Sequence, residues 1–492
     1  MTNRVSIDPL RVIAPIDPKV FGGFAEHLGR CVYGGIFEPG SPLADVDGIR
    51  TDVLAALKRL RMPVLRYPGG NFVSGYRWRD GVGPQDERKA RMELAWHDLE
   101  PNTFGTNEFV GFCRTLGAAP YLAVNAGDGD MREARDWVEY CNGTKDTALV
   151  KLRKRHGYEA PHAVRYWGIG NEVDGPWQIG FKTPEEYART YTEFAKVMKW
   201  TDPSIELVAA GVSLWDRSWV ERVQLLMEHA PTLIDYMAIH WYVGNSRERG
   251  YRDDDFASYM AISERLDDML SGTRGILRAM RSALKLGRDI PIAVDEWNVW
   301  YRVFNEGKLE ETYNLEDALV VAMHFNAFFR HAASVKMANI AQIVNVIAPI
   351  KTSPEGVVLQ TTFHPFELYA STAGDTALDV FWDGATFSTP EFDALRVLDV
   401  SATIDQGRKQ LAVYLVNRSL DQVQSTTIEL QRGRFADGGD LHVINGPNVK
   451  AQNTTQAPDQ VGVRSSRVDG GGNSLTLQLE PHSVTALVIG VA

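Results

Sequence analysis

Two glutamates, each at the end of an apolar segment, could perform acid–base or nucleophilic chemistry. Glu172 ends the segment Val164–Glu172, and Glu296 ends Pro291–Glu296, with Trp and Asn directly after it. A buried parallel strand presents catalytic groups at its carboxyl end in a barrel of alternating strands and helices. Paired carboxylates at two such ends predict a glycosidase. Either glutamate alone could equally be a helix cap or an ion-pair partner, so the prediction depends on the pair.

The other predicted strand ends are also rich in amides, carboxylates and aromatic rings. This ring suits a neutral polyhydroxylated ligand, because aromatic faces pack on sugar C–H groups while amides and carboxylates bind hydroxyls. Its members are Glu26, His27, Tyr67–Asn71, Asn125, Asp128, Asn171, Ser213, Trp215, His240, Trp241, Tyr242, Asp295, Trp297, Asn298, Gln342 and Asn345. Trp96, Trp177 and Trp300 lie in loop-like segments and are candidate sugar platforms, whereas Trp167 lies inside a strand and is expected in the core.

Two of these residues, His27 and His240, could also be metal ligands in a barrel hydrolase. The sequence has no His-x-His and no His-Glu-x-x-His, which are typical of such sites. We therefore expect no metal and no cofactor, with both histidines orienting neighbouring carboxylates through hydrogen bonds.

Strand-like and helix-like segments alternate over most of the chain and would position these residues. Eight strand–helix pairs favour a (β/α)8 (TIM) barrel of the α/β class over residues 16–374. The predicted strands are 20–28, 64–70, 120–127, 164–172, 205–213, 234–242, 291–298 and 335–345. The predicted helices are 49–61, 107–116, 131–141, 184–200, 218–229, 255–286, 315–331 and 362–373.

From about residue 375 the segments become short and rich in β-branched residues, with Gly, Asn, Asp and Pro between them. This pattern predicts a jelly-roll-like β-sandwich over 375–492, to which residues 1–15 contribute a strand. The glycine-rich segments Asp437–Asp440 and Asp469–Asn473 are expected to be turns or loops.

Composition limits the cellular compartment and the classes of partner that we expect. The 492 residues include three cysteines and carry a formal net charge of −11. The cysteines are too few and scattered for a disulfide framework, and the N-terminal residues lack a signal-peptide core. No segment has the length and apolar character of a membrane span. We expect a cytoplasmic protein that binds neither membrane nor nucleic acid, because nucleic-acid binding needs a concentrated basic surface.

Five segments in the same order resemble the α-L-arabinofuranosidases of glycoside hydrolase family 51 nearly end to end. They are Glu26–Pro39, Arg66–Tyr76, Gly168–Trp177, Val294–Asn298 and Lys336–Ile350. The resemblance implies a barrel with a C-terminal β-sandwich, retaining chemistry, no catalytic metal and a homo-oligomer, often a hexamer. It also implies that Glu172 is the acid/base and Glu296 the nucleophile. The resemblance also implies that the furanose subsite is lined by Glu26, Asn71, Asn171, Tyr242 and Gln342.

Two positions depart from the family pattern. Arg79 stands where an acidic residue is frequent, and Trp241 where a smaller or amide residue is common. Both would reshape the pocket rim, which leaves open a preference for galactofuranosides or an endo-glucanase or xylanase activity. A non-catalytic carbohydrate-binding protein and a metal-dependent hydrolase also remain possible. A hydrolysis assay would test the first of these, and a chelator would test the second.

Overall fold

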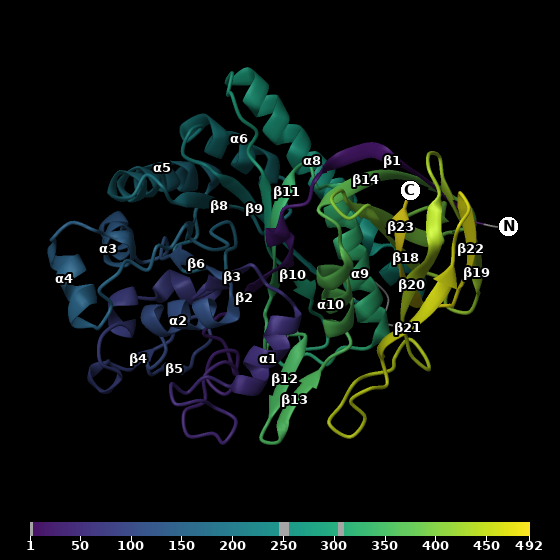
Figure 1. Ribbon diagram of the computed structural model, residues 1–492. Coiled ribbons are helices and arrows are strands. Elements are labelled where there is room, and N and C mark those ends of the chain that lie inside the picture. Colours follow the sequence, from purple (N-terminus) through teal and green to yellow (C-terminus); the bar gives the residue numbers. More distant parts are fainter. Residues whose placement is uncertain (1–2, 246–254, 304–308) are drawn as a thin grey trace.

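The structure is a computed structural model that describes residues 3–245, 255–303 and 309–492 (Figure 1). Eight strands close into a barrel in the order β10-β11-β2-β3-β6-β7-β8-β9, and every neighbouring pair is parallel. The strands are β2 (Gly22–Phe24), β3 (Val64–Tyr67), β6 (Ala119–Val124), β7 (Tyr166–Ile169), β8 (Glu206–Val212), β9 (Tyr236–Val243), β10 (Ile292–Val299) and β11 (Val335–Ala341). The predicted (β/α)8 barrel is confirmed.

Several strands end earlier than the sequence pattern predicts. The predicted strand 164–172 stops at Ile169, and the segment 20–28 contains only the short strand Gly22–Phe24. Glu172 and Glu26 therefore lie in the loops that follow β7 and β2. A loop position allows backbone geometries that a strand does not, and Glu172 has a φ of +41°.

Helices follow most of the barrel strands and surround the barrel (Figure 1). The helices are α1 (Thr51–Arg59), α2 (Thr106–Leu116), α3 (Met131–Asn142), α4 (Ala148–Arg155), α5 (Pro184–Thr201), α6 (Trp219–His229), α7 (Phe256–Met260), α8 (Ile262–Ala283), α9 (Leu315–Arg330) and α10 (Phe363–Thr372). Thr183 caps α5 in a capping box with Glu186, with Pro184 in the first turn, as expected for a helix start. The predicted helix 255–286 is divided into α7 and α8.

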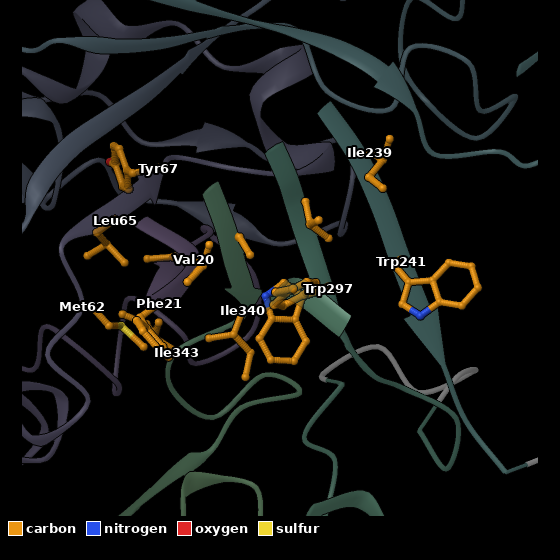
Figure 2. Close-up of a cluster of buried hydrophobic side chains, with 14 of the residues drawn as sticks. Val20, Phe21, Met62, Leu65, Tyr67, Ile239, Trp241, Trp297, Ile340 and Ile343 are labelled. Carbon is orange, nitrogen blue, oxygen red and sulfur yellow. The ribbon is translucent and has the colours of Figure 1, made fainter. Parts of the chain in front are cut away.

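Side chains on the two faces of the barrel strands belong to separate cores. The barrel interior contains Val64, Tyr121, Tyr166, Val208, Tyr236, Ala238, Ala293 and Met337. The outward faces pack against the helices in a larger cluster, part of which Figure 2 shows. Trp167 is fully buried in this outer cluster, as predicted, and the three cysteines are also buried and free.

The C-terminal part forms a curled, sandwich-like sheet of nine strands in the order β21-β20-β23-β18-β17-β14-β1-β19-β22 (Figure 1). Its strands are β1 (Asn3–Pro15), β14 (Thr376–Asp383), β17 (Leu398–Asp405), β18 (Gln410–Asn417), β19 (Gln424–Leu430), β20 (Phe435–Asn445), β21 (Gly462–Asp469), β22 (Ser474–Leu479) and β23 (Ser483–Val491). Strand β1 pairs antiparallel with β14 and parallel with β19. The boundaries 1–15, 16–374 and 375–492 stay predictions.

One prediction in this sheet is wrong. Asp437–Asp440 is not a turn, because it lies inside β20, where the pairing with β23 shifts register between Phe435 and Gly439. A Cβ on Gly439 would lie 2.8 Å from the Ile489 Cβ, so glycine here permits close strand approach rather than chain reversal.

Helix α9 lies between the barrel and the sheet (Figure 1), and residues 315–329 are all buried. None of the helices in the described part of the chain combines the length and apolar composition needed to cross a membrane.

Candidate active site

Glu172 and Glu296 meet at the carboxyl end of the barrel. A carboxylate oxygen of one lies within 4.8 Å of a carboxylate oxygen of the other. His240 lies between them, with its Nδ1 atom 3.0 Å from Glu172 Oε1 and 3.5 Å from Glu296 Oε2. Burial lowers the pKa of His240, but the carboxylates of Glu296 and Glu172 outweigh burial and raise it overall. His240 therefore hydrogen-bonds the Glu172 carboxylate, as expected, and lies beside that of Glu296.

A register shift in β10 brings two successive carboxylates to the barrel interior. The pairing of β10 with β9 is irregular between Val294 and Glu296, which is where Asp295 lies. Asp295 accepts a hydrogen bond from the Tyr121 hydroxyl at 2.9 Å, and Glu296 accepts one from the Tyr242 hydroxyl at 2.7 Å. In a regular strand successive side chains face opposite sides, so the irregularity is what allows both to point inward.

Arg66 is the buried cation of the site, and it was not among the predicted site residues. Its guanidinium donates to Glu296 Oε1 at 2.7 Å and to Asn171 Oδ1 at 2.6 Å, and lies 3.4 Å from Asp295 Oδ2. Burial lowers the pKa of Arg66, but Asp295 and Glu296 raise it more, so the group stays charged. The sequence feature that could have identified Arg66 is a charged residue within the apolar strand Val64–Tyr67, since a buried charge needs a partner.

Glu26 is a further buried carboxyl group of the site. Its carboxylate accepts hydrogen bonds from the Trp96 indole N–H at 3.1 Å, the Phe72 backbone N–H at 3.0 Å and the Gln342 amide at 2.8 Å. Burial and the nearby charge of Glu296 raise the pKa of Glu26 to about 8. Three residues predicted for substrate binding are therefore in direct contact here.

The remaining predicted subsite residues also lie close to the carboxylates. The Asn171 amide donates to Asn71 Oδ1 at 3.4 Å. The Tyr242 ring packs edge-on against Trp300, with 5.7 Å between ring centroids. Burial, followed by the charge of Glu296, raises the pKa of Tyr242 well above its usual range, so its hydroxyl remains a donor. The Trp177 indole N–H donates to Glu172 Oε2 at 2.8 Å.

A short hairpin of β4 (Arg91–Met92) and β5 (Leu99–Glu100) carries Trp96 into the site. The Glu93 carboxylate accepts hydrogen bonds from the backbone N–H groups of Ala95 and Trp96 and shapes the tip. His27 Nδ1 lies 2.8 Å from Glu100 Oε2 and so anchors the base of the hairpin. His27 orients a carboxylate as expected, but that carboxylate, Glu100, was not among the predicted residues.

Trp241 does not reshape the pocket rim, contrary to the prediction. His240 and Tyr242 face the carboxylates of Glu172 and Glu296, so Trp241, between them on β9, faces the opposite way. It is buried in the cluster that Figure 2 shows, and it packs edge-on against Trp215, with 6.3 Å between ring centroids. Its register partner Trp297 likewise packs outward, against His324, Phe325 and Phe328 of α9.

Other predicted strand-end residues serve the local backbone instead of the site. Asn125 binds Asp128 and backbone groups of its own turn, Ser213 binds Asp174, and Asn345 binds Thr352 and the Arg30 carbonyl. Arg79 forms an ion pair with Asp136 of α3 and stacks over Trp78 at 4.7 Å. The contacts of Arg79 are thus with the helix layer, not with the two glutamates.

Glu172, His240 and Glu296 also have a spacing that a metal ion could use, since their ligand atoms lie within 4.8 Å of one another. A pair of carboxylates can also hydrolyse a glycoside without metal, with one as the acid and the other as the nucleophile. The absence of a metal requirement stays a prediction.

Comparison with known proteins gives consistent matches along the chain. Residues 56–258 match the α-L-arabinofuranosidase 1 domain, and residues 295–483 match the α-L-arabinofuranosidase C-terminal domain. The chain is 46% identical to α-L-arabinofuranosidase C of Emericella nidulans, over 75% of this chain and 74% of that protein. It is 37% identical to the intracellular exo-α-(1→5)-L-arabinofuranosidase 1 of Bacillus subtilis, over 98% and 97%. The structure of the GH51 α-L-arabinofuranosidase of Thermotoga petrophila superposes with a TM-score of 0.91 at 35% identity, covering 99% of this chain and 100% of that one.

Proposed function

The chain belongs to the α-L-arabinofuranosidases of glycoside hydrolase family 51, and we propose that it releases terminal non-reducing α-L-arabinofuranosyl residues from arabino- or arabinoxylo-oligosaccharides by double displacement. The observation that carries the retaining mechanism is the spacing of the carboxylates of Glu172 and Glu296, whose oxygens approach within 4.8 Å. Retaining enzymes hold their carboxyl groups about 5 to 5.5 Å apart, whereas inverting enzymes need about 6.5 to 9.5 Å to admit a water.

In the first step Glu296 attacks the anomeric carbon while Glu172 gives its proton to the departing oxygen. The bond from the anomeric carbon to the leaving group breaks as the glycosyl ester forms. Arg66 and Tyr242 both donate to the Glu296 carboxylate and hold it in line for attack. This orientation limits the motion of the nucleophile before reaction, which is a large part of enzymatic rate enhancement.

In the second step Glu172, now ionised, removes a proton from water, and the oxygen of that water attacks the anomeric carbon. The ester bond to Glu296 breaks, and Glu172 recovers its proton. Formation of the ester removes the negative charge of Glu296, which makes proton release from Glu172 easier in the first step. Return of that charge then favours the protonated acid for the next cycle.

The furanose would lie between the two catalytic carboxylates and Glu26. Glu26 and the amides of Asn71, Asn171 and Gln342 would bind its hydroxyls, together with the Tyr242 hydroxyl. Trp96, Trp177 and Trp300 would provide apolar surface for sugar C–H groups. The hydrogen bonds of Asn171 to Arg66 and of Gln342 to Glu26 support this assignment, because they fix the amide orientations in advance.

Relatives named as intracellular enzymes, from Bacillus subtilis and Halalkalibacterium halodurans, support action in the cytoplasm on imported oligosaccharides rather than on intact polymer. We expect a homo-oligomer, with the hexamer as the form that the family resemblance implies.

The proposal is tested by measuring release from aryl α-L-arabinofuranoside, aryl β-D-galactofuranoside, arabino-oligosaccharides and insoluble arabinoxylan. We expect hydrolysis of the arabinofuranoside and the short oligosaccharides, with first-formed arabinose of retained anomeric configuration by NMR. A clear preference for the galactofuranoside would move the specificity to the other furanose. Activity confined to pyranosides, or an inverted first product, would contradict the proposal.

A further inference from the structure

The two oxygens of the Glu172 carboxylate have different partners. Oε2 accepts a hydrogen bond from the indole N–H of Trp177 at 2.8 Å, and Oε1 lies 3.0 Å from His240 Nδ1. The His240 nitrogen also approaches Glu296, so Oε1 is the oxygen on the side of the nucleophile. The Trp177 side chain is 52% exposed, so Oε2 is on the side of solvent.

Trp177 is held in this position by the loop that carries Glu172. The Asp174 carboxylate accepts hydrogen bonds from the backbone N–H groups of Ser213 and Leu214, at 2.8 and 2.9 Å, which fixes the loop to the end of β8. A Cβ on Gly175 would lie 2.4 Å from the Trp177 ring, so this glycine lets the ring pack directly on the backbone.

An indole nitrogen donates a hydrogen bond and has no lone pair to accept one. While the Trp177 bond is made, a proton on Glu172 Oε2 always faces a donor. A proton on Oε1 faces His240 Nδ1, which accepts when the neutral imidazole carries its proton on Nε2, so in that tautomer the proton belongs on Oε1. Oε1 faces the space between the two glutamates, where the glycosidic oxygen must lie during attack by Glu296. The Trp177 N–H thus makes the two oxygens of the acid chemically different.

We propose that Trp177 is a positioning residue that directs the acid proton to Oε1 of Glu172. This inference rests on the proposed roles of Glu172 and Glu296, and it is separate from any role of the Trp177 ring as a sugar platform. Without the indole N–H, the proton also occupies Oε2, where it does not reach the leaving group. Substrates whose leaving groups need a proton should therefore suffer, and substrates whose leaving groups depart unaided should not.

The test is Trp177→Phe, which retains an aromatic ring and removes the N–H donor. Because Trp177 also provides apolar surface for the sugar, we expect a loss in kcat/KM that is common to all substrates and that is the whole effect for dinitrophenyl arabinofuranoside. For aryl arabinofuranosides with poorer leaving groups we expect a progressive loss that reaches about tenfold or more, within the range that general acid catalysis supplies. Trp200→Phe, at an exposed position of α5, is the matched control and should show no dependence on the leaving group.

A second variant tests the same contact without changing the tryptophan. Gly175→Ala places a methyl group against the ring and should displace the N–H, so its leaving-group profile should follow that of Trp177→Phe. Equal losses for all leaving groups, or a wild-type profile in both variants, would overturn the proposal. If Trp177→Phe is normal and Trp177→Ala only raises KM for oligosaccharides, the ring is a platform alone. Failure of the proposed function would instead appear in the wild-type enzyme, as absent or inverting hydrolysis of arabinofuranosides.

Discussion

At the mouth of the barrel, carboxylates outnumber cationic side chains. At the junction between the barrel and the sheet, the described residues named below include as many cationic side chains as carboxylates. The mouth holds Glu26, Glu172, Asp295 and Glu296 with Arg66 and His240. At the junction, Arg330 contacts Asp267 at 2.6 Å and Asp399 at 3.1 Å, His331 contacts Asp267 at 2.9 Å, and Arg418 contacts Glu264 at 3.0 Å.

The two regions shift the pKa values of carboxyl groups in opposite directions. At the mouth, burial and the charge of Glu296 raise the pKa of Glu26 to about 8. At the junction, burial would raise the pKa of Asp267, but Arg330 outweighs burial and lowers it well below the usual range. Burial alone therefore does not decide the charge. Matched charges stabilise the domain contact, whereas an excess of carboxylates provides groups that gain and lose protons during a reaction.

The largest effect should come from the nucleophile. Glu296→Ala removes the attacking group, so kcat/KM should fall on the order of 10⁵-fold for every substrate, regardless of leaving group. The melting temperature should stay close to that of wild type or rise, because a carboxylate is removed from a region in which carboxylates outnumber cations. A variant that melts much earlier, or keeps appreciable activity, would show that Glu296 is structural.

Glu172→Ala should separate the two chemical steps. With poor leaving groups the loss should reach about 10²- to 10⁴-fold, because protonation of the departing oxygen is missing. With dinitrophenyl arabinofuranoside the first step should survive, and a burst of phenolate should precede slow turnover that azide partly restores. Stopped-flow absorbance measures the burst, and equal losses for good and poor leaving groups would exclude the acid/base role.

Glu26 should make the protein less stable as the pH rises towards 8. Its folded-state pKa of about 8 is above its ordinary value of 4.5, so its contribution is complete below 4.5 and is lost as the pH rises through about 8. Between pH 6 and 8 the free energy of unfolding should fall on the order of 2 kcal/mol more in wild type than in Glu26→Gln. Denaturant unfolding at several pH values measures this, and parallel curves would contradict the prediction.

At the junction, stability should depend on pH in the opposite direction and at lower pH. Changing the junction should not reduce activity. Asp267→Asn should reduce the free energy of unfolding at pH 7 by about 1 to 2 kcal/mol, because Arg330 loses a charged partner. The lowered pKa of Asp267 means that this stability is present above its ordinary value of 3.8 and is lost as the pH falls further. The difference from wild type should therefore shrink in acid. Asp268→Asn, on the exposed side of α8, is the control.

The smallest expected effect is that of a chelator. Prolonged treatment with a strong chelator should leave the hydrolysis rate unchanged, because the proposed chemistry uses Glu172 and Glu296 without a metal. Activity that is lost and then restored by zinc or manganese would assign the group of Glu172, His240 and Glu296 to a metal site instead.

Local sequence patterns predicted the helices well, because their signals are contained in a few consecutive residues. The predicted helix 184–200 is Pro184–Thr201, with the expected cap at Thr183. Glu172 and Glu296 were identifiable for a related reason, since the carboxyl ends of parallel barrel strands must meet on one face. The inward turn of Asp295 and the outward direction of Trp241 were not predictable, because both depend on register and on the alternation of side chains.

The fold class, the family and the residues that bring carboxylates to one end of the barrel can be inferred from the sequence alone. Which groups touch, and which charges are balanced, depends on the tertiary structure. Arg66 and Glu296 are 230 positions apart, and Glu26 and Gln342 are 316 apart, so no local pattern contains these pairs. The pKa of a buried carboxyl depends on such neighbours and on burial, and both arise only when distant segments pack together.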